Sequence, residues 1–148
     1  MQRPFMLWPL IIVLISFALG GFSGGVPMLA DPANGGYLQF ADLLPLLPVP
    51  NLIMPGLFLL IVMGLFPLFL VYALIARPEW TWLDRFFQWS KHHWAWTGTL
   101  ILVAIIAIWL AYEAWLIGWF PITTLTAIQG MLILLLAMVP SVRKFYAR

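Results

Sequence analysis

The sequence predicts an all-α, polytopic membrane protein with four transmembrane helices, and three observations lead to this fold class. Hydrophobic residues make up 64% of the 148 residues and only 8% are charged, whereas soluble domains average about 25% charged residues. Four apolar segments approach or exceed the ~20 residues that a helix needs to cross ~30 Å of hydrocarbon. All lysines and arginines lie outside these segments. We therefore expect a single membrane domain, residues 1–148.

The four predicted spans are residues 5–24, 52–76, 94–118 and 122–139. The first span also resembles a secretory signal peptide, because Arg3 is followed by an apolar run and small residues. Since the sequence starts at Met1, we expect this segment to be retained as a span. The second span contains Pro67, whose missing N–H predicts a kink. The lone polar residues Glu113 and Gln129 do not disqualify the third and fourth spans.

The basic residues predict the orientation of the chain. They are Arg3, Arg77, Arg85, Lys91, Arg143, Lys144 and Arg148. They fall at the two termini and in the segment 77–93, whereas the connections 25–50 and 119–121 contain none. Because lysine and arginine favour the cytoplasmic side, both termini should be cytoplasmic. Tryptophans gather near the predicted interfaces, where indoles anchor helices. These are Trp8, Trp80, Trp82, Trp89, Trp94 and Trp96 inside, and Trp115 and Trp119 outside.

Two connections are long enough to have structure of their own. The outer one is rich in proline and glycine, and its residues 31–36, DPANGG, are typical of a turn. The apolar stretch after that turn is either a lid over a cavity or a packed connector. In the inner connection, Leu83, Phe86, Phe87 and Ser90 recur at the i, i+3, i+4, i+7 spacing of a helix face. This pattern predicts an amphipathic helix that lies on the membrane or docks a partner.

The motif GGFSGG, residues 20–25, contains two overlapping G-xxx-G spacings, Gly20/Gly24 and Gly21/Gly25. Such spacing lets two membrane helices approach closely. Glycine also ends helices, and this motif lies at the end of the first predicted span. Both interpretations stay open. Neither implies chemistry.

The third span carries one carboxylate, Glu113, in the stretch IWLAYEAWLIGW. A charge within a span is costly, so this side chain should face protein or a wet pocket. The very short connection 119–121 makes spans three and four antiparallel neighbours, and Gln129 lies at nearly the same depth. We expect Glu113 to pair with Gln129, with Thr126 and Gly130 on the same face as Gln129. The alternative is a proton-carrying or cation-binding carboxylate.

Cofactor, metal and catalytic sites are weakly indicated. His92 and His93 precede the third span, and imidazole can ligate haem, chlorophyll or metal. Metal sites need several ligands, and the nearest acid in sequence is Asp84. We therefore expect no metal, no catalytic residues and no cofactor, and treat both histidines as solvated at the interface. The net charge of +2 gives no reason to expect nucleic acid as a partner, and the absence of cysteine excludes thiol chemistry.

Four patterns occur in order along the chain: the glycine pairs followed by DPANGGYL, then PVPNLIMPGLFLL, the acid in the third span, and QG in the fourth. In these patterns the sequence resembles a widespread family of small, uncharacterised four-span bacterial inner-membrane proteins. In that family the Asp-Pro turn and the Pro-Gly-Leu helix start recur, matching Asp31-Pro32 and Pro55-Gly56-Leu57 here. The resemblance covers nearly the whole chain and implies the fold and a bacterial inner membrane. It implies no activity.

The sequence favours a non-enzymatic accessory or structural subunit, with lipid and other integral membrane subunits, or further copies of itself, as partners. One alternative is a small carrier or channel component, which would have a wet cavity around Glu113, Gln129 and Thr126. The other is a subunit associated with a pigment, haem or quinone, which would be contacted by His92 or His93 and the tryptophans.

Overall fold

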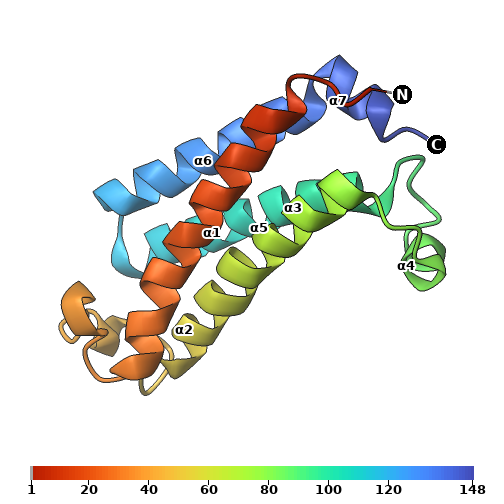
Figure 1. The fold of residues 1–148 in the computed structure, drawn as a ribbon. Helices are drawn as coiled ribbons and strands as arrows, with labels where there is room; N and C mark the ends of the chain where they lie inside the picture. The colour runs from red at the N-terminus through yellow and green to blue at the C-terminus, as the bar shows by residue number, and fades with distance from the viewer. Residues whose placement is uncertain (1) are drawn as a thin grey trace.

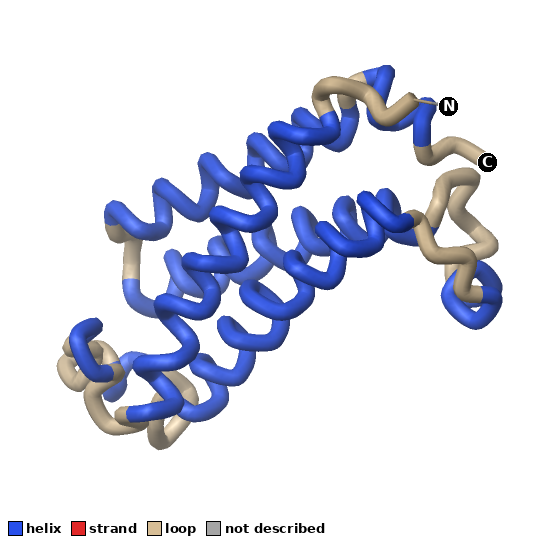
Figure 2. Tube along the Cα trace, viewed as in Figure 1, coloured by secondary structure: helices blue, strands red, loops and turns tan. Residues whose placement is uncertain are grey.

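A computed structural model describes residues 2–148 of the chain. Most of these residues are helical (Figure 1). Helix makes up 73% of the structure, and residues 2–148 contain no β-strand. Figure 2 shows that the remaining segments are connecting loops and the two ends. The helices in chain order are α1 (Leu7–Ala30), η1 (Gly36–Leu38), η2 (Leu44–Leu46), α2 (Ile53–Leu60), η3 (Ile61–Leu65), α3 (Phe66–Ala76), α4 (Thr81–Phe86), α5 (Trp94–Ile117), α6 (Pro121–Met138) and α7 (Pro140–Phe145).

Four helices are long and apolar enough to cross a membrane: α1, the continuous helix formed by α2, η3 and α3, then α5 and α6. This part of the predicted fold class is confirmed. The four helices form a closed ring, because α1 packs between α2–α3 and α6, and α5 packs against both α3 and α6. Both termini, α4 and α7 lie at one end of the bundle, here called the termini end, and the 31–52 loop lies at the other.

The glycine motif does not end the first helix, because α1 continues six residues beyond the predicted boundary, to Ala30. The helix-termination interpretation is therefore wrong. Gly21 and Gly25 instead face the α2–η3 backbone: a Cβ on Gly21 would lie 2.3 Å from the Met63 carbonyl oxygen, and one on Gly25 would lie 2.8 Å from the Leu60 nitrogen. These two glycines allow the close packing that the spacing predicts.

The other three glycines predicted at helix contacts have different surroundings. A Cβ on Gly130 would lie 3.1 Å from Cγ2 of Ile106 in α5, so Gly130 lies in the α5–α6 contact. Gly24 approaches only the Leu59 side chain, at 3.0 Å. Within residues 2–148 nothing lies within 4 Å of a Cβ on Gly20, so Gly20 makes no close helix contact there and its packing role stays a prediction.

Pro67 explains the π-helical turn η3 that separates α2 from α3. Proline has no N–H to donate to the carbonyl four residues earlier, which is that of Met63. In the turn before it the Phe66 N–H bonds to Ile61, five residues back, which is the pattern of a π-bulge. The carbonyl that Pro67 leaves without its helical donor faces Gly21, where a Cα–H can approach it.

The connection between α1 and α2 and the connection between α3 and α5 both contain short helices. In the 31–52 loop the Gly35 N–H bonds to the Asp31 carbonyl at 2.7 Å, and the Leu52 N–H returns to Pro32 at 2.9 Å. Leu52 is fully buried, so it anchors the end of the loop to the bundle. In the other connection α4 is only six residues long. Leu83 and Phe87 pack against the core, whereas Trp82, Phe86 and Trp89 are exposed.

Candidate functional site

Glu113 bonds to a threonine at the start of α6. The Thr123 hydroxyl donates to Oε1 of Glu113 at 3.2 Å, and Thr123 is only 1% exposed. The same threonine oxygen accepts the Phe120 N–H at 3.3 Å, which helps to cap α6. Glu113 therefore ties α5 to α6 by an interhelical polar contact, as the sequence predicts, but its partner is Thr123 rather than Gln129.

The predicted pairing of Glu113 with Gln129 is wrong. Gln129 donates instead to the Ser16 hydroxyl of α1, at 3.0 Å. The physical reason is helix geometry: successive residues lie about 100° apart around a helix. Gly130 faces Ile106 of α5, so its neighbour Gln129 is turned toward α1.

Thr126 does not join either pair, because its hydroxyl bonds to the Ile122 carbonyl of its own helix at 2.9 Å. The predicted group Glu113, Gln129 and Thr126 is thus divided among three separate contacts. Ser16 and Thr123 were not predicted from the sequence as partners of these residues. Their signals were weak but readable: Ser16 is the one hydroxyl in the apolar stretch 5–22, and Thr123 follows closely on Pro121.

His93 is a buried helix cap rather than a solvated residue. Its Nδ1 accepts the Ala95 N–H at 3.2 Å, and its Nε2 lies 3.2 Å from the Pro78 carbonyl. Since Nδ1 accepts, Nε2 carries the proton and donates it to Pro78. Both ring nitrogens are therefore engaged. The expectation of interfacial solvation is wrong for His93, which is 2% exposed.

His92 differs from its neighbour because its ring stacks on Trp96, with ring centroids 4.2 Å apart. Trp96 is itself buried and donates its indole N–H to the Ala137 carbonyl at 2.9 Å. Trp94 donates to the Pro78 carbonyl at 3.1 Å. These two tryptophans are internal ties rather than the interfacial anchors that the sequence predicts. No group of three or more His, Cys, Asp or Glu in residues 2–148 is placed to hold a metal ion.

The last residues of the described chain clamp the termini end. The buried Tyr146 hydroxyl donates to the Leu74 carbonyl at 2.5 Å, and the Tyr146 carbonyl accepts the His93 N–H at 2.7 Å. Arg148 bonds through its backbone N–H to Lys91 at 2.8 Å and through its guanidinium to Asp84. This clamp joins α3, α7 and the connection before α5.

The His93 cap should make stability depend on pH. Burial lowers the pKa of the His93 imidazole below its usual 6.5, and a proton on Nδ1 would face the Ala95 N–H. The unfolded chain then binds more protons near pH 6 than the folded chain does. The contribution of neutral His93 to the free energy of unfolding is therefore complete above about pH 6.5, and it is lost as the pH falls toward the folded-state pKa. We expect the temperature midpoint of unfolding in detergent to decrease as the pH is lowered from about 7.5 to about 5.5.

The variant His93→Asn isolates that effect, since asparagine caps a helix without titrating. Its midpoint should vary less with pH than that of the wild type, whereas His92→Asn should keep most of the wild-type slope. Equal slopes in wild type and His93→Asn would contradict the assignment.

The chain matches no protein-family model, and no curated protein or solved structure matches it. Two pairs of polar side chains form interhelical contacts: Glu113–Thr123 ties α5 to α6, and Gln129–Ser16 ties α6 to α1.

Proposed function

We propose that the protein is a non-enzymatic integral membrane protein of the bacterial inner membrane and serves as an accessory or structural subunit of a larger membrane complex. The four long apolar helices support insertion into a bilayer. The basic residues support an orientation with the termini end in the cytoplasm. The exposed side chains Trp82, Phe86 and Trp89 would then rest at the cytoplasmic interface.

The Ser16–Gln129 hydrogen bond is the observation that carries the subunit role. It lies at the exposed side of the α1–α6 contact, about 12 Å along α6 from Pro121 at 1.5 Å per residue. That depth is far from either end of the helix. A lipid-facing amide at this depth has no water to bond. The bond uses one N–H of the Gln129 amide and leaves its Oε1 and second N–H for another partner. A neighbouring protein helix supplies such a partner, whereas lipid tails do not.

The same face is shaped for a second helix. Gly20 lies one turn beyond Ser16 on α1, and space around its would-be Cβ is open. Small residues four apart let helix backbones come close. The partner is another membrane subunit or a second copy of this chain.

The carrier alternative has less support, because its three residues Glu113, Gln129 and Thr126 make separate contacts instead of lining one cavity. A pigment, haem or quinone role through His93 would require breaking the helix cap and the bond to Pro78.

The test of the subunit role is purification from native membranes in mild detergent, with the mass of the assembly and of each co-purifying protein recorded. We expect the wild type to migrate in a complex and Gln129→Leu to dissociate from it while keeping its helical spectrum. Gln88→Leu, the same change at an exposed position in the α4–α5 connection, should leave the complex intact.

A monomeric wild type would overturn the proposal, as would a complex that survives Gln129→Leu unchanged. Because the chain has no cysteine, the single variant Gly20→Cys also reports the face directly. With a photo-activated cross-linking reagent attached to its thiol, this variant should become linked to the partner, which identifies either another subunit or a second copy.

A further inference from the structure

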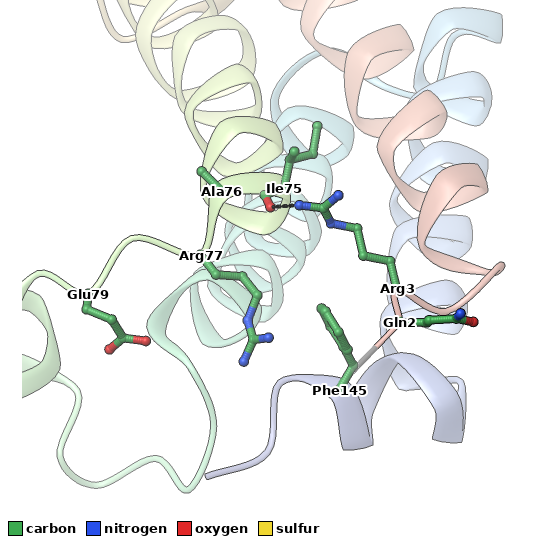
Figure 3. Close-up of a pocket in the computed structure, with 7 residues that line it drawn as sticks. All are labelled: Gln2, Arg3, Ile75, Ala76, Arg77, Glu79 and Phe145. Carbon is green, nitrogen blue, oxygen red and sulfur yellow. Dashed lines mark hydrogen bonds between the residues drawn. The ribbon is translucent and has the colours of Figure 1, made fainter.

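An open pocket of about 570 Å³ lies at the termini end, between the start of the chain and the end of α3. Its polar walls are formed by Gln2, Arg3, Arg77 and Glu79, with Phe145 below them. In Figure 3 the Arg3 side chain reaches from the start of the chain to Ile75 at the end of α3, and the Arg77 side chain points away from it, beside the Phe145 ring. The two arginines come from segments more than seventy residues apart in sequence.

Arg77 is held in place, but its side chain forms no hydrogen bond with the described residues 2–148. It caps α3 with its backbone in the left-handed region, at φ 48°, which residues other than glycine rarely adopt. Its guanidinium carbon lies 4.5 Å from the centre of the Phe145 ring and 5.7 Å from that of Tyr146. Its Nε is buried and has no hydrogen-bond partner within residues 2–148.

Arg3 is held by a hydrogen bond to the end of α3. One terminal nitrogen donates to the Ile75 carbonyl at 2.9 Å, one of the carbonyls that the end of α3 leaves without a helical donor. A guanidinium has five N–H donors, so most of those on Arg3 remain for a ligand.

The local carboxylates are directed to a different cation. Glu79 lies 3.9 Å from the guanidinium of Arg148, and Asp84 pairs with the same group. No carboxylate in the described part of the chain forms an ion pair with Arg3 or Arg77. Two guanidiniums with unused donors therefore line one pocket, where a group with several anionic oxygens can accept hydrogen bonds from them.

We propose that the pocket formed by Gln2, Arg3 and Arg77 binds a phosphate group. The planar forks of two guanidiniums match the oxygens of a phosphate, which they bind in bidentate geometry. The phosphate is either the headgroup of an anionic phospholipid or a free phosphate ion. The headgroup source follows from the proposed membrane insertion, which places the ends of α1 and α3 at headgroup level, and basic pockets there bind anionic lipid heads.

The experiment is native mass spectrometry of the purified full chain in detergent, titrated separately with phosphatidylglycerol, phosphatidylcholine and inorganic phosphate. We expect phosphatidylglycerol to bind at least about tenfold more tightly than phosphatidylcholine. Loss of a charge-assisted hydrogen bond weakens binding by roughly tenfold or more, so Arg77→Gln and Arg3→Gln should each lower the affinity by that factor. Arg85→Gln removes the same charge from the exposed side of α4 and should change it little.

The arms separate the two sources. Arginine-dependent binding of phosphatidylglycerol identifies a lipid headgroup, and arginine-dependent binding of inorganic phosphate alone identifies the free ion. Equal binding of both phospholipids without phosphate binding overturns the proposal, as does an equal loss in Arg85→Gln. If Arg77→Gln fails to fold, Arg3→Gln carries the test, because Arg3 is exposed at the chain start. The single purified chain is used throughout, so a failure of the subunit role would not affect the result.

Discussion

Replacing Gly21 by alanine is expected to destabilise the protein by about 1–3 kcal/mol, the range found for overpacked sites. The new Cβ would lie 2.3 Å from the Met63 carbonyl oxygen and 2.7 Å from the Gly64 nitrogen. Both atoms belong to the backbone of η3, so no side chain can rotate away, and α1 must move from its neighbour. The midpoint of unfolding in detergent, followed by tryptophan fluorescence at a fixed heating rate, should fall.

Gly20→Ala is the matched control, one residue earlier on the same helix. In the described part of the chain nothing lies within 4 Å of its added methyl group, and alanine favours a helix over glycine by up to about 1 kcal/mol. Its midpoint should therefore stay level or rise. Similar behaviour of the two variants would mean that the contact between α1 and η3 is not as close as the structure has it.

Replacing Tyr146 by alanine is expected to cost about 3–5 kcal/mol, the range for large buried aromatic side chains. Tyr146 is fully buried and its hydroxyl bonds to the end of α3. Burial also raises the pKa of the Tyr146 phenol above its usual value, so the group stays neutral and donates this bond. Hydrogen exchange should increase around α7 and in residues 87–93, because the clamp at the termini end opens.

Two further variants separate the contributions to this effect. Tyr146→Phe keeps the ring and leaves the Leu74 carbonyl without its donor, which should cost about 1–3 kcal/mol. Tyr72→Ala removes a tyrosine that is 51% exposed on α3 and should cost much less. An unchanged exchange pattern in Tyr146→Ala would show that the tail does not hold the end of the bundle.

The sequence determined the positions of the four long helices. A helix that can cross a membrane must carry about 20 apolar residues in succession, and this requirement is readable without any tertiary contact. It also determined that Pro67 disturbs the second long helix and that residues 31–36 form a turn. Each of these features depends on the local chain alone: proline lacks an N–H, and glycine accepts positive φ.

Only the tertiary structure decided which side chains meet. Depth along a helix can be counted, but in helices that are apolar on every side the facing direction has no hydrophobic stripe to mark it. A rotation of about 100° per residue separates Gly21, against a backbone, from Gly20, which is open. The same rotation turns Gln129 toward Ser16 and leaves Glu113 to Thr123. The burial of His93 under the returning tail was unreadable for a related reason, since it joins segments more than fifty residues apart.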